Sequence, residues 1–395
     1  MSKETKTPIA FVCQRYGPHV NGGSEQYCRQ VAEKLSVDYD VTVYTTCAKD
    51  YITWQNHYAP GTETKDGITI KRYPVKKTRN RYLSALVARL LRIFPWHPES
   101  AEWRWIDLQG PFCPDLLDAL KTEASGYQKV FFMTYLYYTS VKGLMLDLPN
   151  AVLIPTLHDE PPAYFRCYDS AFSKAKKLVW LTPEEREFAY RRFPQIKNTQ
   201  SVLAGIGIDE PVILPKANLL PKEIRNTLYL LYVGRIAESK GCGEMFRYFQ
   251  RYKRNHPGDL KLVLLGRPVM KIPEDPDILS LGFVDEDVKT AIMINARALV
   301  LHSRYESLSM VVLESMMLGR PILVTARSEV LKGHCERSNA GLSFERYEEY
   351  EKALTTLMTD QSKYQNMSEK GRDYVRKNYS WDNILQAYRQ IIEND

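Results

Sequence analysis

Short apolar segments alternate with amphipathic helical patterns along the 395 residues, and this alternation constrains the fold more than any other feature. A first series of strand candidates covers residues 9–12, 41–45, 68–70, 130–133, 152–154, 178–181 and 201–204. A second series covers residues 229–233, 260–265, 278–281, 298–301 and 322–324. Strands separated by helices pair in parallel and are covered by helices on both faces. The sequence therefore predicts an α/β protein with two doubly wound parallel sheets.

A polar stretch that contains several prolines separates the two series. It begins with Gly207-Ile208-Asp209-Glu210-Pro211, and Pro215 and Pro221 follow. This composition is typical of a linker, and the chain is longer than a single hydrophobic core normally allows. We therefore predict one domain over residues 1–207 and another over residues 208–379. Ligands of such sheets bind beyond the carboxyl ends of the strands, so we expect the ligand in a cleft between two facing domains.

The composition excludes several classes of protein. The net charge of +7 is compatible with anionic ligands and is too small by itself to indicate nucleic-acid binding. Seven cysteines, odd in number and without C-x-x-C spacing, indicate reduced thiols in a cytoplasmic protein. The polar start of the chain predicts no signal peptide, and no apolar run approaches the ~18 residues of a membrane-spanning helix. The histidines lack metal-ligand spacing, so we predict no metal site.

Two carboxylates stand eight positions apart near the start of an apolar helical pattern. Glu306 follows the strand candidate 298–301, and Glu314 lies inside the apolar run 310–318. A helix that begins just after a strand directs free N–H groups and a positive dipole end above the sheet, so we expect phosphate there. Ser309 is expected to be the N-cap of this helix. A buried Glu314 needs a hydrogen-bonding partner, which is either a sugar or ribose hydroxyl or a structural arginine or backbone amide.

Two cations follow the strand candidate 229–233. Arg235 and Lys240 stand in the loop Gly-Arg-Ile-Ala-Glu-Ser-Lys-Gly. Arginine grips phosphate oxygens with a planar fork and lysine adds a point charge, so the pair favours a diphosphate ligand. The loop has neither the phosphate-binding loop pattern nor the dinucleotide fingerprint. The alternative is that both charges are solvated on the surface.

Two loops of the first half also follow strand candidates. Gly22 and Gly23 directly precede a helical pattern, and glycine there allows close approach of a ligand to the helix start. The alternative for this pair is a plain turn. His158 follows the strand candidate 152–154 and is placed to contact a sugar hydroxyl. Its alternative is a capping or packing role.

The motifs of the second half occur in a familiar order. Gly-Arg-x₄-Lys-Gly is followed by Leu-Leu-Gly at 264–266, Leu-Gly-Phe-Val at 281–284, Glu-x₇-Glu, and Gly-Arg-Pro-Ile at 319–322. Together with Gly22-Gly23 and His158, this order resembles the retaining glycosyltransferases of family 4, of the bacterial cell-surface glycan type, over nearly the whole chain. The resemblance implies the GT-B fold, with two Rossmann-like domains facing across a cleft. It also implies that a last helix, about 380–395, crosses back to the first domain.

The resemblance assigns roles to individual residues. Arg235 and Lys240 would bind the donor diphosphate, Glu306 would contact the donor sugar, and His158 would lie near the transferred sugar. These four are the catalytic candidates. The complete set of donor-binding candidates is Gly22, Gly23, Arg235, Lys240, Gly266, Phe283, Val284, Glu306, Leu308, Ser309, Met310 and Glu314. In this set the backbone of Phe283 and Val284 would meet the base, and Glu314 the ribose.

The implied activity is transfer of a hexosyl unit from a nucleotide-diphosphate sugar, with UDP the first guess and GDP the second. The acceptor would be a glycan or a lipid-linked acceptor of cell-surface polysaccharide synthesis, bound by the first domain. The two cations and the helix dipole would stabilise the leaving diphosphate, so neither a metal nor another cofactor is expected. Ser307 and Ser309 stand where many relatives have glycine or a bulkier residue, which leaves the donor sugar open.

Two other functions remain as alternatives. A sugar-nucleotide epimerase of the same fold is disfavoured by the Glu-x₇-Glu element combined with Gly-Arg-x₄-Lys. A non-catalytic module that binds nucleotide sugars is disfavoured because the cations and carboxylates are all present.

A basic segment lies in the first half. Residues 67–98 contain eight Lys and Arg and no acidic residue. Within it, apolar residues recur with helical spacing at 83, 86, 87, 90, 91 and 94, and Trp96, Trp103 and Trp105 follow. We expect this apolar stripe to pack on the core of the first domain. We expect the basic residues of 71–105 to attract an anionic surface on the inner face of the membrane.

Overall fold

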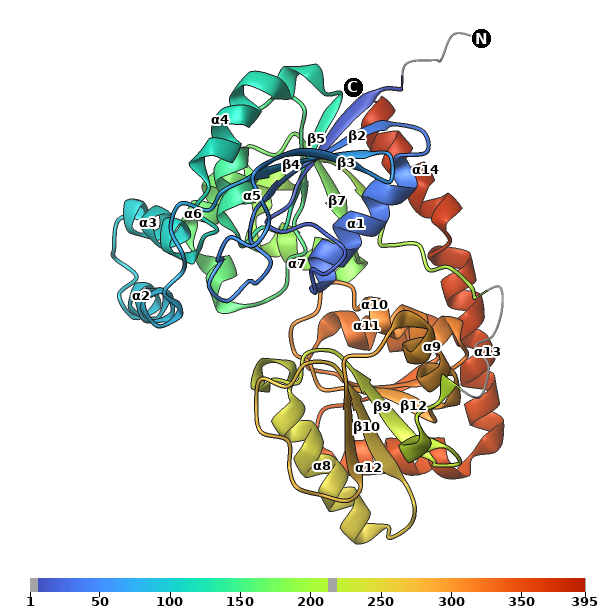
Figure 1. Cartoon of the computed structure of the whole chain (residues 1–395). Coiled ribbons are helices and arrows are strands. Elements are labelled where there is room, and N and C mark those ends of the chain that lie inside the picture. The colour runs from blue at the N-terminus through green and yellow to red at the C-terminus, as the bar shows by residue number, and fades with distance from the viewer. Residues whose placement is uncertain (1–5, 212–218, 395) are drawn as a thin grey trace, which may run out of the picture. The chain divides into compact units, whose positions relative to one another are not determined.

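The computed structural model describes residues 6–211 and 219–394 (Figure 1). Contacts divide the chain into two compact units. The first comprises Met1–Ile206 and Ile384–Asp395, and the second comprises Gly207–Asn383. The chain therefore enters the second unit within the predicted linker and returns to the first unit within the last helix. Each unit contains one sheet, parallel in the second unit and parallel except for one edge strand in the first, with helices packed on it.

The sheet of the first unit has eight strands in the order β3-β4-β2-β1-β5-β6-β7-β8. Their bounds are Pro8–Val12 (β1), Asp40–Thr46 (β2), Gly61–Lys65 (β3), Ile68–Tyr73 (β4), Lys129–Met133 (β5), Ala151–Ile154 (β6), Lys177–Trp180 (β7) and Gln200–Leu203 (β8). The pairs are parallel except that β3 runs antiparallel to β4. β3 was not predicted, because its residues are polar or glycine and all of them are exposed at the sheet edge.

The helices of the first unit are α1 (Gly23–Leu35), α2 (Arg81–Ile93), α3 (Glu99–Gln109), α4 (Pro114–Glu123), α5 (Tyr138–Leu144), α6 (Arg166–Phe172), α7 (Pro183–Arg192) and most of α14 (Trp381–Glu393). The last helix packs through its apolar face. Ile384, Ile391 and Ile392 are buried, and the hydroxyl of Tyr388 lies 2.7 Å from that of Tyr27 on α1. The end of the chain is therefore part of the first unit's core.

The sheet of the second unit has six strands in the order β11-β10-β9-β12-β13-β14, and its pairs are parallel. Their bounds are Tyr229–Val233 (β9), Lys261–Leu265 (β10), Ile278–Gly282 (β11), Ala298–Leu301 (β12), Ile322–Thr325 (β13) and Gly341–Phe344 (β14). The helices are α8 (Cys242–Asn255), α9 (Glu286–Asn295), α10 (Met310–Met317), α11 (Glu329–Ser338), α12 (Tyr347–Thr359) and α13 (Gln361–Asn378). The edge strand β14 was not predicted, because only two of its four residues are apolar.

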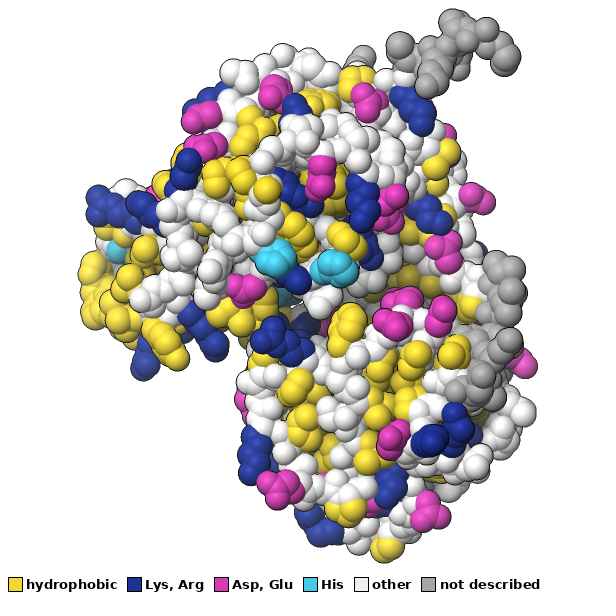
Figure 2. Space-filling view, in the orientation of Figure 1, with side chains coloured by type: hydrophobic (Ala, Val, Ile, Leu, Met, Phe, Trp, Pro, Cys, Tyr) yellow, Lys and Arg dark blue, Asp and Glu magenta, His cyan; other side chains and the backbone are white. Residues whose placement is uncertain are grey.

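The helix α2 contradicts the expectation that its apolar stripe packs on the core. Leu86 is 53% exposed and Leu90 is 43% exposed, whereas Ser84 and Leu91 are buried. The indole of Trp105 donates to the carbonyl of Ser84 at 3.0 Å, which turns that side of α2 toward the protein. The stripe predicted to be buried therefore lies mostly in solvent. Hydrophobic side chains gather over α2, with Lys and Arg side chains beside them (Figure 2).

Within residues 6–211 and 219–394, no helix is both long enough and apolar enough to cross a bilayer.

Candidate functional site

The strand order locates a topological switch point in each sheet, where the chain changes the side on which it adds strands. In the second unit the chain adds β10 and β11 on one side of β9, and then β12, β13 and β14 on the other side. The switch therefore falls between β9 and β12. In the first unit the same reasoning places it between β1 and β5. Open α/β sheets bind their ligands at such switch points, beyond the carboxyl ends of the strands.

Two predicted residues meet at the switch point of the second unit. Lys240 ends a short 3₁₀ turn after β9, and Glu306 lies in the loop after β12. Although they are 66 positions apart, Nζ of Lys240 donates to Oε1 of Glu306 at 2.7 Å. Both side chains are partly exposed, so a ligand can reach the pair. The structure thus brings together the cation predicted for the diphosphate and the carboxylate predicted for the sugar.

The loops after β9 and β10 also come close to each other. Gly266 has φ +135°, and a Cβ there would lie 2.0 Å from the carbonyl oxygen of Gly234. Only glycine tolerates both the backbone conformation and this approach. The hydroxyl of Tyr232 donates to the carbonyl of Arg235 at 2.8 Å and so holds the backbone of that cation. Gly266 is therefore required by backbone packing beside the loop that contains Arg235.

Glu314 has a partner that the sequence did not predict. Its carboxylate accepts from Nζ of Lys289 on α9 at 3.0 Å, and Lys289 also contacts Glu286. Burial of Lys289 favours its neutral form, but these two carboxylates outweigh that effect and raise the pKa of Lys289. Glu314 is itself only partly buried. A ribose hydroxyl would consequently join an existing ion pair, and the partner is neither the arginine nor the backbone amide considered as the alternative.

Ser309 occupies the N-cap position of α10, but its side chain makes no capping hydrogen bond. The predicted N-cap position is therefore confirmed, but the serine hydroxyl does not supply the capping hydrogen bond that is usual for this residue. The backbone of Ser309 is left-handed, with φ 64° and ψ 75°. This conformation costs an L-residue about 1–2 kcal/mol, and glycine adopts it freely. Ser309 thus holds a backbone conformation that glycine would adopt without strain.

Phe283 and Val284 follow β11, the edge strand, which lies two strands from β9. The side chain of Phe283 is 73% exposed and contributes little to the core. The structure does not bring these two residues into contact with Lys240 or Glu306 through any interaction that it describes. Their predicted role, contact with the nucleobase, remains a prediction.

A buried ion pair shapes the Gly22-Gly23 loop after β1. Nη2 of Arg15 lies 2.5 Å from Oε1 of Glu25, and both side chains are about 5% exposed. Gln14 also donates to that carboxylate oxygen at 2.9 Å. A Cβ on Gly22 would lie 2.1 Å from the second oxygen of Glu25. Glycine is therefore needed to accommodate the buried carboxylate. Arg15 and Glu25 were missed because a short polar loop gives no signal that its charges are buried.

His158 is held by a neighbouring carboxylate. Its Nε2 lies 3.2 Å from Oε1 of Glu160, and the same oxygen accepts from the hydroxyl of Tyr135 at 2.6 Å. Tyr135 follows β5, so the contact joins loops at the ends of two neighbouring strands. The side chain of His158 is partly exposed. Glu160 was missed, although it stands only two positions from the predicted histidine.

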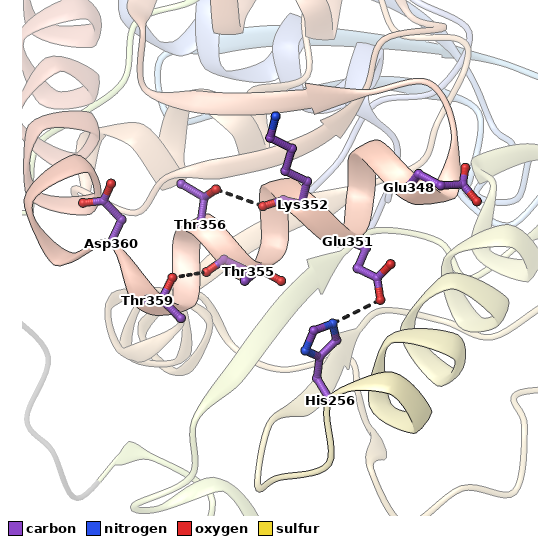
Figure 3. A pocket seen from close by; sticks show the side chains of 8 residues that line it. All are labelled: His256, Glu348, Glu351, Lys352, Thr355, Thr356, Thr359 and Asp360. Atoms are coloured by element: carbon purple, nitrogen blue, oxygen red, sulfur yellow. Dashed lines mark hydrogen bonds and ion pairs between the residues drawn. The ribbon is translucent and has the colours of Figure 1, made fainter.

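One surface cavity lies away from these residues. Its volume is about 450 Å³, and it is lined by residues of α12 together with His256 at the end of α8 (Figure 3). Its lining residues are His256, Glu348, Glu351, Lys352, Thr355, Thr356, Thr359 and Asp360. None of the predicted donor-binding residues is among them. Across the described ranges, no three His, Cys, Asp or Glu side chains are grouped so that they could hold a metal ion.

Known proteins resemble this chain in sequence and in fold. Residues 221–374 match the family described as glycosyl transferases group 1. The chain is 23% identical to the putative glycosyltransferase YtcC of Bacillus subtilis (strain 168), over 98% of this chain and 92% of that protein.

Solved structures share the architecture over both units. One is WaaG, a glycosyltransferase involved in lipopolysaccharide biosynthesis, with a TM-score of 0.66 and 14% identity over 98% of this chain and 100% of that one. Another is the alpha,alpha-trehalose-phosphate synthase (UDP-forming) from Burkholderia vietnamiensis. It has a TM-score of 0.70 and 11% identity over 98% of this chain and 100% of that one.

Proposed function

We propose that this chain is a glycosyltransferase of the GT-B fold, with a group 1 domain at residues 221–374, and that it transfers a hexosyl unit from a nucleotide-diphosphate sugar with retention of configuration. The observation that carries the proposal is the contact between Lys240 and Glu306 at the switch point of the second sheet. A cation and a carboxylate at this point match a ligand that has a diphosphate next to a sugar.

The ion pair suggests how the donor is bound. When a diphosphate enters, Lys240 exchanges Glu306 for phosphate oxygens. Glu306 then accepts hydrogen bonds from hydroxyls of the donor sugar. Arg235, from the same loop as Lys240, and the positive end of α10 add to the stabilisation of the diphosphate. Before the donor binds, the ion pair compensates both charges. When the donor binds, its phosphate and hydroxyl groups become the new partners of Lys240 and Glu306.

We propose a chemical step in which the configuration of the anomeric carbon is retained. The bond between the anomeric carbon and the diphosphate oxygen breaks, and the electron pair stays on the diphosphate. The acceptor hydroxyl attacks the same face, its oxygen bonds to the anomeric carbon, and its proton passes to the leaving phosphate oxygen. Lys240 and Arg235 stabilise the charge that develops, so we propose that no metal ion is required. His158, held by Glu160, is proposed to contact the transferred sugar.

The donor is proposed to be a UDP sugar, with a GDP sugar as the second choice. The UDP-forming synthase that shares the fold supports the first choice. Thermal unfolding should be measured against a panel of nucleotide sugars, because a ligand at 100 times its Kd stabilises the folded state by about 2.7 kcal/mol. A rise in Tm with one donor, and turnover in EDTA with a product whose anomeric configuration matches the donor, are expected. A strict need for a divalent ion, or an inverted product, would refute the mechanism.

Slow hydrolysis of the donor in the absence of acceptor separates the alternatives. A transferase releases the nucleoside diphosphate and free sugar, whereas a binding module leaves the donor intact. An epimerase would return an isomeric sugar, which NMR of the reaction mixture identifies.

The acceptor is proposed to be a glycan or a lipid-linked acceptor of cell-surface polysaccharide, and α2 is proposed to hold the enzyme at an anionic membrane. WaaG, involved in lipopolysaccharide biosynthesis, supports the first part. For the second part, Leu86 and Leu90 are exposed on α2, and Trp96 just beyond it is 77% exposed. Arg89 and Arg92 of the same helix are exposed too. An exposed apolar face bordered by cations suits an anionic bilayer surface.

Vesicle flotation tests the membrane contact. We expect the protein to float with vesicles that contain phosphatidylglycerol at low salt, and less with neutral vesicles. The double variant Leu86→Glu, Leu90→Glu should stay in solution. Val37→Glu is the matched control, because Val37 is 71% exposed in the same unit but is remote in sequence from α2. Equal flotation of the double variant and the control would exclude α2 as the contact.

A further inference from the structure

The turn that leads into α10 has an unusual backbone. Leu308 is buried, Ser309 has the left-handed φ of 64°, and Met310 begins the helix. In the proposed function, the amide groups of this turn face the donor. The peptide between Leu308 and Ser309 is planar and trans, so its C=O and N–H point in opposite directions. Whatever fixes the carbonyl of Leu308 therefore also fixes the direction of the N–H of Ser309.

A buried histidine fixes that carbonyl. Nε2 of His334, on α11, lies 2.8 Å from the carbonyl oxygen of Leu308. Because a carbonyl only accepts, Nε2 must carry the proton and donate it. The other ring nitrogen, Nδ1, lies 3.3 Å from the hydroxyl of Tyr374, which donates to it. His334 is fully buried, and this burial together with the charge of Arg337 lowers the pKa of His334 to about 4. The ring is thus neutral and has one tautomer.

Tyr374 is itself anchored from two sides. Its hydroxyl accepts from Nε of Arg337 at 3.2 Å and lies 3.3 Å from the hydroxyl of Tyr379. Donation to His334 and acceptance from these two groups uses the full capacity of a phenolic hydroxyl. α13, which contains Tyr374, and α11, which contains His334 and Arg337, therefore hold the imidazole in one orientation.

We infer that His334 is a positioning residue for the donor: by holding the carbonyl of Leu308 toward the protein interior, it directs the N–H of Ser309 outward to the nucleotide sugar. This inference rests on the proposed function. Loss of the hydrogen bond would allow the peptide to flip. A flip would move Ser309 out of the left-handed region and relieve its backbone strain, but it would turn the N–H inward. The strain of Ser309 thus favours the inactive direction of the peptide, and His334 opposes it.

The test replaces His334 and measures binding of UDP, and of GDP as the second probe, together with kcat and KM for the donor found by thermal unfolding. His334→Leu removes the donor to Leu308, and we expect binding of the nucleoside diphosphate and kcat/KM to fall about tenfold. His334→Gln is the matched control, because its amide can reach the position of Nε2 and donate. Binding and kcat/KM of His334→Gln should remain within about threefold of the values of the unchanged protein. A tenfold change corresponds to about 1.4 kcal/mol.

A second variant shows whether the effect passes through Ser309. Glycine at position 309 adopts the left-handed conformation without strain, so backbone strain no longer favours the flipped peptide. In the Ser309→Gly background, the loss caused by His334→Leu should shrink from about tenfold to about threefold, a coupling that a double-mutant cycle measures. If His334→Leu does not fold, His334→Asn replaces it, since asparagine is polar but too short to reach Leu308.

The outcomes are distinguishable. Weaker binding in His334→Leu, rescue in His334→Gln and coupling to position 309 support the assignment. A His334→Leu variant that loses only thermal stability, with unchanged binding, kcat and KM, overturns this assignment alone. Failure of the unchanged protein to bind or turn over any nucleotide sugar overturns the proposed function, and this assignment with it.

Discussion

The two units have related sheets, but the ion pairs near their switch points differ in burial. In the first unit the pair Arg15–Glu25 is buried and packed against glycine. In the second unit the pair Lys240–Glu306 is partly exposed. A buried pair that loses one partner leaves an uncompensated charge, whereas an exposed pair exchanges partners easily. The comparison teaches that the first pair builds its loop and that the second pair is available to a ligand.

The largest expected effect is on the stability of the first unit. Glu25→Ala should lower the free energy of unfolding by about 3–5 kcal/mol, because Arg15 would remain buried without its carboxylate. Urea denaturation measures this change. Glu33→Ala, which removes an exposed carboxylate from the same helix, is the control and should cost less than about 1 kcal/mol. Equal stability of the two variants would remove the distinction between the units.

The second prediction concerns activity. Lys240→Ala should reduce kcat by about 10²–10³-fold, because the charge on the leaving diphosphate loses a fixed cation. Its free energy of unfolding should change by less than about 1 kcal/mol, since a partly exposed ion pair contributes little. Steady-state kinetics and urea denaturation of one preparation measure both quantities. Lys142→Ala, from a partly exposed pair with Asp107 in the first unit, is the control for loss of a lysine. Unchanged turnover in Lys240→Ala would contradict the assigned role.

The third prediction concerns how the stability of the second unit depends on pH. In the second unit, a hydrogen bond from His302 lowers the pKa of Glu244 to about 2, and Arg327 adds to this effect although partial burial opposes it. A carboxyl whose folded pKa is lowered stabilises the fold above its unfolded pKa, near 4.5, and this contribution disappears as the pH falls toward 2. With allowance for solvent screening, the contribution is about 1–2 kcal/mol.

The corresponding variant is Glu244→Gln. Its free energy of unfolding should fall less steeply than that of the unchanged protein between pH 4.5 and pH 2. Urea denaturation at several pH values measures the two slopes. Parallel curves would show that Glu244 does not contribute in this range.

The smallest expected effect is at Ser309. Ser309→Gly should stabilise the protein by about 0.5–1 kcal/mol, since relief of the left-handed strain exceeds the entropy that glycine loses on folding. Differential scanning calorimetry measures the rise in Tm. Ser328→Gly is the control, because the side chain of Ser328 caps α11 and its loss should lower Tm slightly. A lower Tm for Ser309→Gly would show that the serine side chain stabilises the turn by more than the strain costs.

Much of the architecture could be predicted because strands and helices leave a periodic signal in the sequence. The buried strands β1, β5, β9 and β12 are apolar runs, and each predicted strand has its counterpart. The edge strands β3 and β14 were missed because an edge needs few apolar residues. For α2 the periodicity was correct but the buried face was not, since a helical stripe does not reveal which surface covers it.

The candidate site was predictable in its residue types and less so in its contacts. Lys240 and Glu306 were expected at one ligand, and they do contact each other. Lys289 and His334 gave no signal, because each acts through a residue at least 25 positions away. Such partners depend on how helices pack across the sheet, and a single sequence does not encode that packing in any local pattern.

By itself, the sequence determined the alternation of strands and helices, the division into two halves and the order of the charged loops. These properties are local, because they arise from side-chain periodicity and turn residues along the chain. The tertiary structure alone decided that Glu314 pairs with Lys289, that Ser309 is left-handed and that the Leu86 side of α2 is exposed. Each of these depends on strand order and on contacts between distant segments, where packing outweighs the preference of the individual residue.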